Sequence, residues 1–420
     1  MQSSTEKVTT TVSGVVPSGT RQRLDHIDAM RPIKQTAVIS THALLFFSPL
    51  STSLLASGIL TLTHFSRDAF LFVSACMLAY SYRNSETVAM GHYWKRRFMA
   101  VGLVYLVWTV IYFPMAALVP ASRFPYFHLP LSSIFSATGA HNFFVSLATG
   151  YFHLYFLLVL LEFYVVFPYV FKLLRRFPRS HVYVVVGAVL WQIVFPYVVR
   201  RGWFGFSISS KLEARLVFSY PLYLLGGVVA AFYLDAFHDW VLRHRRAILS
   251  WTIVAGAVPI MLDYLHSHGV AIPKIIVPGG DPFAAAVIPF DVGAIIAVYL
   301  LGVYLVSPQR SARTKAITTS GSEAAYGIYV SQMVWILVMH RWAVHFDLFQ
   351  RVPWLVLTIL AVTVTYLLGW IFSAVVARTP LSRALVGRSR LPWATLFPHR
   401  RQLAPAAHGD FGEGPLNLTD

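Results

Sequence analysis

The sequence predicts an all-α, polytopic integral membrane protein, a bundle of about ten transmembrane helices with both termini in the cytoplasm. Three observations lead to this fold class. Of the 420 residues, 56% are hydrophobic and only 12% are charged, whereas ordinary globular domains carry roughly 25% charged residues. The apolar residues gather in long runs, separated by short clusters of Lys and Arg. The 31 Phe, 21 Tyr and 11 Trp residues exclude a disordered chain.

Ten segments are apolar enough and long enough to cross the roughly 30 Å hydrocarbon core of a bilayer. In chain order they are 34–52, 58–82, 98–120, 150–171, 181–199, 214–234, 247–266, 283–306, 323–344 and 354–377. We expect every one to be a helix, because none shows the alternating pattern of a barrel strand.

These spans predict a single membrane domain over residues 31–380. A flexible cytoplasmic tail is expected at 1–30, a cytoplasmic C-terminal tail at 381–420, and the largest outside segment near 121–148. No fixed-period repeat divides the domain.

The distribution of positive charge predicts the orientation. The net charge is +17, and most Lys and Arg residues fall on the segments that share a side with the N-terminus, the first of them holding Arg31 and Lys34. The positive-inside rule therefore places both termini of a multi-pass protein in the cytoplasm, at the cytoplasmic membrane. The expected partner is the lipid bilayer. Nucleic acid is not expected, because no soluble basic domain carries the charge.

Several kinds of active site are excluded by what the sequence lacks. Cys76 is the single cysteine, so no intramolecular disulfide is possible, and no spacing of Cys and His is typical of a metal site. We therefore expect no metal. A phosphate-binding Walker loop, a dinucleotide-binding glycine pattern and a Gly-x-Ser-x-Gly turn are also missing.

The first span carries the leading candidate residue. His42 lies within the apolar run VISTHALLF, and Arg31 precedes it by eleven residues, about three helical turns and ~16 Å of rise. Both residues therefore lie on nearly the same helical face. Such a face could hold an anionic carrier at Arg31 while its reactive end reaches His42. Alternatively, Arg31 is a topological anchor and His42 a hydrogen-bonded packing residue.

Ionisable groups occur in other spans, where each is a functional candidate. Arg67 and Asp68 are adjacent, and adjacent residues do not face each other on a helix, so we expect each to have a partner elsewhere. Glu162 in the fourth span could orient an imidazole or pair with an arginine. Asp263 and Asp291 are expected to make polar contacts between helices or to line a cavity.

A basic cluster, Lys95, Arg96 and Arg97, stands just before the third span. Arginine suits two-pronged contacts with phosphate. The cluster could therefore bind a phosphorylated cofactor or the membrane surface, or serve topology alone.

Five short motifs follow one another along residues 27–332. The first, IDAMRPIKQTAVISTH, places Asp28, Arg31 and His42 at the spacing Asp-x-x-Arg, ten residues, His. The second runs from Asp68 through Phe-Leu-Phe-Val to Ser74 and Ala75. Together they resemble the opening motifs of the acyltransferase type 3 family, Leu-Asp-x-Leu-Arg with a later His and Asp-Leu-Phe-Phe-Val-Leu-Ser-Gly. Ala75 replaces the glycine.

The remaining motifs resemble the same family with some departures. The basic cluster resembles the family's Arg-x-x-Arg, but Ala100 replaces the second arginine. His153-Leu-Tyr155-Phe-Leu resembles its His-Leu-Trp-Phe-Leu. Many members of the family carry a pair of acidic residues in this helix, whereas here Glu162 follows two leucines. In this respect the sequence resembles the exopolysaccharide-modifying branch of the family, which also lacks the acidic pair. Near the C-terminus, Ala-Tyr-Gly-Ile-Tyr resembles Ser-Tyr-Gly-Ile-Tyr, with Gln332 where a His is common.

The resemblance implies an integral membrane O-acyltransferase that moves an acyl group, often acetyl, from acyl-CoA to a hydroxyl. The acceptor is expected to be a carbohydrate, a cell-surface polysaccharide or a glycosylated natural product. Acyl-CoA, most simply acetyl-CoA, is the expected co-substrate. The expected roles are catalytic for His42, Asp28 and Asp68, with His42 as general base; donor-binding for Arg31, Lys95, Arg96 and Arg97; and acceptor-binding for His153, Tyr155 and Glu162.

Two other classes of protein remain open at this point. A secondary transporter or polysaccharide flippase would also have many spans and charges within the membrane, although no inverted repeat is present. A non-catalytic assembly or sensory membrane protein would leave the histidine within the first span unexplained.

Overall fold

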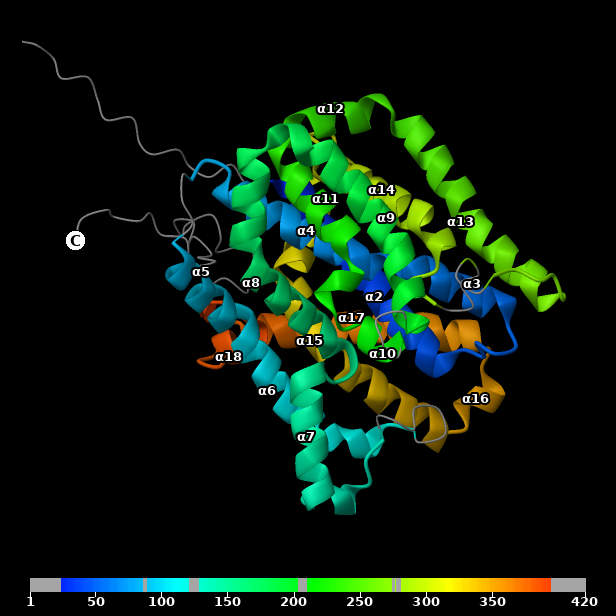
Figure 1. The fold of residues 1–420 in the computed structure, drawn as a ribbon. Helices are drawn as coiled ribbons and strands as arrows, with labels where there is room; N and C mark the ends of the chain where they lie inside the picture. The colour runs from blue at the N-terminus through cyan, green and yellow to red at the C-terminus, as the bar shows by residue number, and fades with distance from the viewer. Residues whose placement is uncertain are drawn as a thin grey trace, which may run out of the picture.

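The computed structural model describes residues 24–85, 89–120, 128–202, 210–273, 276 and 281–393. The predicted tails at 1–30 and 381–420 therefore lie outside the described residues except for 24–30 and 381–393. Within the described residues all regular secondary structure is helical (Figure 1). The prediction of an all-α fold is confirmed.

The helices follow one another with short connections. The α-helices are α1 (Asp25–Asp28), α2 (Met30–Phe47), α3 (Leu54–Thr63), α4 (Phe65–Tyr82), α5 (Met90–Arg97), α6 (Leu103–Tyr112), α7 (Ala137–Thr149), α8 (Tyr155–Arg176), α9 (His181–Arg200), α10 (Ser210–Glu213), α11 (Pro221–Phe232), α12 (Leu234–Arg243), α13 (Arg245–Ser267), α14 (Ile288–Val306), α15 (Ala312–His345), α16 (Leu348–Arg351), α17 (Trp354–Val376) and α18 (Ser382–Val386). The π-helix η1 (Phe98–Gly102) and the 3₁₀ helices η2 (Pro114–Leu118), η3 (Leu131–Ser133), η4 (Phe152–Leu154), η5 (Pro178–Ser180), η6 (Val217–Ser219) and η7 (Ala285–Val287) connect them.

Five helical segments of the described chain are long and apolar enough to cross a membrane. They are Ala137–Arg176, Pro178–Arg200, Arg245–Ser267, Ala285–Val306 and Trp354–Val376. The pair α11 and α12, bent by 100°, adds a sixth if it forms one span. The predicted number of ten is therefore not confirmed.

Several of the predicted spans are not single α-helices, and two of them are divided near their middle. The segment 58–82 is divided at His64 into α3 and α4. The segment 98–120 consists of η1, the ten-residue α6 and η2, with Pro114 at the start of η2. Part of the predicted outside segment near 121–148 is the helix α7, so this part is not a loop.

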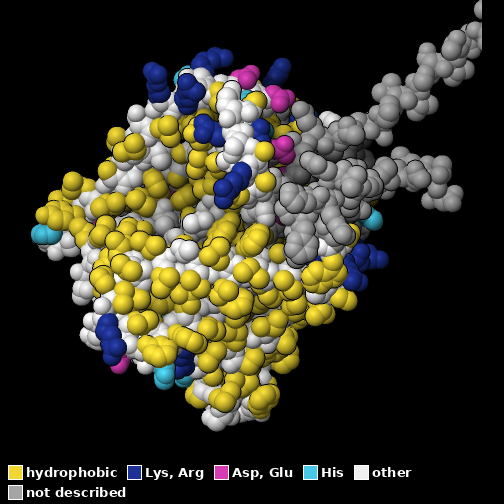
Figure 2. Space-filling model, turned by 180° about the vertical axis from the view of Figure 1, so that it is seen from behind, with side chains coloured by type: hydrophobic (Ala, Val, Ile, Leu, Met, Phe, Trp, Pro, Cys, Tyr) yellow, Lys and Arg dark blue, Asp and Glu magenta, His cyan; other side chains and the backbone are white. Residues whose placement is uncertain are grey.

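The outer surface is that of a protein in contact with lipid. Figure 2 shows a broad hydrophobic area across one face, with most Lys and Arg side chains gathered toward its edges. Helices α9, α13 and α17 leave large apolar side chains exposed, among them Leu190, Ile253 and Ile359. A water-soluble helix would bury such residues and present polar ones instead. The structure is therefore a membrane helix bundle.

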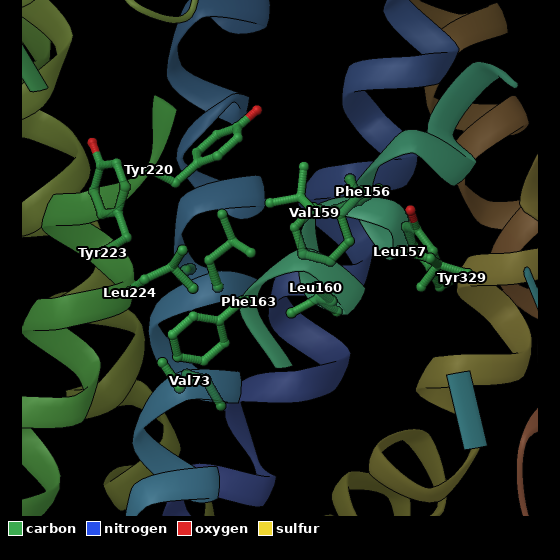
Figure 3. Close-up of a cluster of buried hydrophobic side chains, with 14 of the residues drawn as sticks. Val73, Phe156, Leu157, Val159, Leu160, Phe163, Tyr220, Tyr223, Leu224 and Tyr329 are labelled. Carbon is green, nitrogen blue, oxygen red and sulfur yellow. The ribbon is translucent and has the colours of Figure 1, made fainter. Parts of the chain in front are cut away.

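The interior is built around α2, which contacts α4, α14, α15 and α17 (Figure 1). Beside it, α4, α8 and α11 pack through a cluster that includes Val73, Phe156, Phe163 and Leu224 (Figure 3). The closest approach is at Gly227 of α11, where a Cβ atom would overlap a backbone carbonyl of α4. This packing fixes α4 and α8 relative to α2, and these three helices carry half of the predicted site residues.

The first and last described residues lie at one end of the bundle. Helix α1 packs on the C-terminal half of α14, where Gly302 approaches the backbone of His26. Arg388, after α18, donates a hydrogen bond to the carbonyl of Glu323 in the first half of α15. A short turn joins α14 to α15, so both contacts lie at the same end. Residues 381–393 pack against the bundle, where Ser382 and Val386 are buried. That this end faces the cytoplasm stays a prediction.

A chain of two histidines and a tyrosine attaches α1 to the bundle. Tyr299 Oη lies 3.1 Å from Nε2 of His26 and 2.8 Å from Nδ1 of His238. Burial, followed by the charge of His238, lowers the pKa of His26 below its usual 6.5, although Asp25 and Asp28 oppose this shift. From pH 6.5 down to the lowered pKa, the unfolded chain therefore binds more protons at this position than the folded chain does.

We expect the melting temperature to fall as the pH drops below 6.5, and His26→Gln to reduce that fall. Glutamine retains a hydrogen-bonding group for Tyr299 but does not titrate. Thermal unfolding of the detergent-solubilised protein at pH 7.5 and 5.5 measures this. The exposed His244 supplies the control His244→Gln, which should leave the pH dependence unchanged. An identical pH dependence in His26→Gln and the wild type would contradict the assignment.

Candidate active site

One face of α2 carries the polar residues that the sequence singled out. Pro32 lies in the first turn of the helix Met30–Phe47. Proline is tolerated there because the backbone N–H groups of a first turn have no hydrogen-bond partner within the helix. Arg31, Gln35 and His42 are spaced by four and seven residues, which places them on a common face. Gln35 is fully buried and Arg31 is half-buried. The face therefore leads from the start of α2 into the interior of the bundle.

His42 lies beside a second histidine that the sequence also predicted. The rings of His42 and His153 are 5.8 Å apart, centroid to centroid, at an angle of 64°. His153 lies in η4, just before α8, so two distant segments supply the pair. Gln332 of α15 is the third polar neighbour of His42.

Aromatic residues hold the histidine pair in place. Tyr329 donates a hydrogen bond to the backbone carbonyl of His153 at 2.5 Å. The rings of Tyr112 and Tyr329 pack edge-on against the His153 ring at 5.3 Å and 5.1 Å. This frame restricts rotation of the imidazole, as required of a group that must meet a substrate in one orientation.

The side chains of this cluster have buried polar atoms without hydrogen-bond partners among the described residues. They are Nδ1 of His42, both ring nitrogens of His153, and both amide atoms of Gln332. Native interiors rarely leave such atoms unpaired. The arrangement can accept a proton at an imidazole and can donate a hydrogen bond from an amide to a nearby oxygen.

Beside the histidine pair is a buried group of charged residues. Arg67 contacts both carboxylate oxygens of Asp68, at 3.0 Å and 3.2 Å. The two adjacent residues thus pair with each other, which was not expected, and each also has the partner elsewhere that was expected, since Arg67 donates a hydrogen bond to the carbonyl of Pro282 at 3.4 Å. Asp68 also interacts with Asp291 of α14, which accepts a hydrogen bond from Tyr223 at 3.1 Å. The interhelical contact predicted for Asp291 is confirmed.

This charged group continues toward the end of α9. Arg200 forms ion pairs with Glu213 and with Asp281. Its Nε lies 2.6 Å from Oε2 of Glu213, and its Nη2 lies 3.1 Å from Oδ1 of Asp281. His64 lies close enough to Arg67, His42 and Asp281 to interact electrostatically with all three. No group of three His, Cys, Asp or Glu side chains that could hold a metal ion occurs in the part of the chain that the structure describes.

The predicted donor-binding cations lie at the other end of α2. Arg31 pairs with Asp28 at 3.0 Å, and their side chains are 31% and 16% exposed. Lys34 is only 1% exposed, and its Nζ lies 4.3 Å from the centre of the Phe70 ring. Lys34 is therefore not the solvent-exposed topological cation that the sequence suggested, because its position on α2 turns it toward α4.

The basic cluster before the third span divides between two environments. Lys95 is exposed, whereas Arg97 turns inward, with its guanidinium 5.9 Å from the ring of Tyr93 and 5.8 Å from that of Tyr164. Nε of Arg97 and Oη of Tyr93 are buried without hydrogen-bond partners among the described residues. Arg96, between them in sequence, is partly buried. Arg97 and Tyr93 thus present unpaired donors suited to an anion.

Arg31 and Arg97 lie at comparable depth below the histidine pair. Tyr164, the neighbour of Arg97, follows His153 by eleven residues, and Arg31 precedes His42 by eleven, so each interval rises about 16 Å. Arg175, at the C-terminal end of α8, hydrogen-bonds to the carbonyl of Ser85, just after α4. Helices α4 and α8 therefore end on the same side, and this is the side where α2 begins, because His64, just before α4, lies near His42 in the second half of α2.

Two predicted acceptor-binding residues lie along α8. The backbone N–H of Val217 donates a hydrogen bond to Oε2 of Glu162 at 2.7 Å. Glu162 therefore neither orients an imidazole nor pairs with an arginine within the described structure, because η6 packs against this part of α8. Tyr155 begins α8 next to the histidine pair and is half-buried. It interacts with Arg67 and Arg215.

A pocket opens beyond the far end of α2, five residues after His42. Its volume is about 580 Å³. It is lined by Phe47, Ser48, Pro49, Phe349, Gln350, Arg351, Val352, Pro353 and Trp354. Aromatic rings and hydrogen-bonding side chains thus share one cavity.

Sequence reasoning missed four polar residues near the predicted ones: Lys34, Gln35, His64 and Gln332. The position of Gln35 could have been found, because a spacing of four from Arg31 and seven to His42 puts it on their face. Gln332 was noted only as a replacement. The burial of Lys34 and the proximity of His64 to His42 depend on contacts between helices, which no local pattern reveals.

Comparison with known proteins gives one match. The family model described as an acyltransferase domain, type 3, matches residues 24–374. This range contains every helix that contributes to the histidine pair and to both cation clusters. No curated protein and no solved structure matches the chain.

Proposed function

The chain belongs to the acyltransferase type 3 family and is a membrane acyltransferase, and we propose that it transfers a short acyl group, most simply acetyl, from acyl-CoA to a carbohydrate hydroxyl. The acceptor class is a cell-surface glycan, a lipid-linked saccharide or a glycosylated natural product. The observation that carries this proposal is the pair of His42, which is partly buried, and His153, which is buried, at the far end of a polar helix face that begins at Arg31.

The donor binds with its nucleotide at the Arg31 end. Arg31 and Arg97 hold its phosphates by charge-assisted hydrogen bonds, with Arg96 and Lys95 adding positive charge at the mouth. The unpaired Nε of Arg97 and Oη of Tyr93 support this placement. The arm of the donor then extends about 16 Å along α2, which brings its thioester to His42.

The transfer itself needs one proton acceptor and one hydrogen-bond donor. His42 takes the proton of the acceptor hydroxyl as the oxygen attacks the thioester carbonyl, because an imidazole suits general-base work near neutral pH. Gln332 donates its amide N–H to the negative oxygen that forms. When the tetrahedral intermediate collapses, the carbon–sulfur bond breaks, the ester remains, and the proton on His42 passes to the leaving thiolate.

The two predicted carboxylates, Asp28 and Asp68, act through their ion pairs with arginines. Asp28 holds the guanidinium of Arg31 in place, and Asp68 neutralises Arg67.

The acceptor approaches from the end of α2 opposite to Arg31. His153 and Tyr155 border this side of the pair, and the aromatic and polar pocket beyond Phe47 has the chemistry that sugars favour: flat rings for their faces and amide or guanidinium groups for their hydroxyls. Glu162 lies two residues before Tyr164, toward the Arg31 end of α8, so the acceptor-binding role predicted for it is not part of this path. With both termini in the cytoplasm and about ten spans of a cytoplasmic membrane, this end faces outward.

Product analysis with the purified protein tests the proposal against transport. The protein in detergent is mixed with radiolabelled acetyl-CoA and a panel of monosaccharides, disaccharides and extracted lipid-linked saccharides. Thiol release together with label in a carbohydrate ester is expected. Uptake of a labelled saccharide by proteoliposomes without thioester consumption would instead identify a transporter and overturn the proposal.

A further inference from the structure

Gln35 is a buried polar residue whose hydrogen-bonding capacity is unused. Its side chain is 0% exposed, and neither its Nε2 nor its Oε1 has a hydrogen-bond partner in the described structure. A buried amide is costly to leave unpaired, and native proteins seldom do so without a reason. Gln35 therefore has the features of a residue that meets a ligand.

The position of Gln35 limits what that ligand can be. On α2 it lies one turn beyond Arg31 and two turns before His42, on the face that joins them. A ligand that reaches from Arg31 to His42 must therefore pass Gln35. The ligand at this point is neither the charged head nor the reacting group, but the section between them.

Aromatic rings lie beside the adjoining position on α2, Lys34. The ring of Phe70 of α4 lies over the Lys34 ammonium. It packs edge-on against Phe156, with ring centroids 5.6 Å apart, and its centroid lies 5.9 Å from that of the Tyr329 ring. Such rings suit a slender chain of methylene groups. An isolated buried amide side chain on the face that joins Arg31 to His42 would select a chain that carries an amide of its own.

We propose that Gln35 binds an amide group of the pantetheine arm of the donor. The arm alternates short methylene runs with two secondary amides, and each amide offers one N–H and one carbonyl oxygen. The Gln35 side chain offers the complementary acceptor, Oε1, and donor, Nε2. This inference rests on the proposed acyl-CoA donor. In that reaction Gln35 is a positioning residue that sets how far the thioester advances toward His42.

Binding measurements with the full-length protein in detergent test the proposal through Gln35→Leu. The dissociation constant of CoA should rise about tenfold to a hundredfold, as expected for a lost hydrogen bond in a buried site. The dissociation constant of adenosine 3′,5′-bisphosphate, which lacks the arm, should stay unchanged. The melting temperature without ligand should not fall, because leucine replaces an unpaired polar group by an apolar one of similar size.

The matched control is Thr36→Val, one position along the same helix, where the side chain is exposed and bonds only to its own helix. It should alter neither dissociation constant. Unchanged CoA binding in Gln35→Leu, equal weakening of both ligands, or a marked fall in melting temperature would each overturn the role assigned to Gln35. A wild-type protein that binds no CoA would instead refute the proposed donor itself.

Discussion

Replacing His42 by Ala is expected to lower kcat for acyl transfer by about 10²- to 10⁴-fold, the contribution typical of a positioned general base. The hydroxyl of a sugar is a poor nucleophile while it keeps its proton. His42 is the imidazole at the end of the polar face of α2, and its Nδ1 has no hydrogen-bond partner among the described residues. The rate of thiol release from acetyl-CoA in the presence of acceptor measures the effect.

The control for this experiment is Thr41→Val, at the preceding position. Thr41 is buried, and its hydroxyl bonds only to the carbonyl of Ala37 in the same helix, so the substitution should leave kcat within a few-fold of the wild type. His42→Ala should retain its affinity for acyl-CoA, because the phosphates bind at Arg31 and Arg97. A His42→Ala protein that is folded and keeps most of its activity would exclude His42 as the base.

Replacing Arg67 by Met is expected to lower the free energy of unfolding by about 3–5 kcal/mol, the cost of leaving a buried charge without its partner. Arg67 contacts both oxygens of Asp68, and Asp68 in turn interacts with Asp291. Removing the guanidinium leaves two neighbouring carboxyl groups inside the bundle with no cation beside them. Unfolding of the detergent-solubilised protein by heat or denaturant measures the loss.

A second substitution separates the charge effect from lost packing. The double variant Arg67→Met with Asp68→Asn should recover part of the stability, because one of the two carboxyl groups is then neutral. The comparison pair is Arg31 with Asp28, where partial exposure makes the ion pair worth about 1 kcal/mol or less. If Arg67→Met lowers the free energy of unfolding no more than Arg31→Met does, the buried carboxyl groups of Asp68 and Asp291 do not need the Arg67 cation for stability, and the prediction is contradicted.

The part of the site that lies on one helix was predictable from the sequence. A histidine within an apolar run is rare enough to stand out, and the helical period alone relates it to Arg31. The same argument applies to Gln35. The all-α class was likewise predictable, because composition and the length of the apolar runs determine it.

Features that depend on contacts between helices were not predictable. No local sequence pattern shows that Arg67 pairs with Asp68, that the backbone N–H of Val217 donates a hydrogen bond to Glu162, or that the Lys34 ammonium lies against the ring of Phe70. The division of the second predicted span at His64 has the same origin. Hydropathy over a long window averages across such a break, so α3 and α4 were predicted as one helix.

The most direct measurement is the thermal stability of the purified protein with a panel of acyl-CoAs, with ATP as an anionic control. Wild type, Arg31→Ala and His42→Ala are compared. A donor at a hundred times its dissociation constant should add about 2.7 kcal/mol of stability to the wild type and to His42→Ala, but not to Arg31→Ala. If no acyl-CoA stabilises a well-folded wild-type protein, acyl-CoA is not its donor and the path from Arg31 to His42 carries some other ligand.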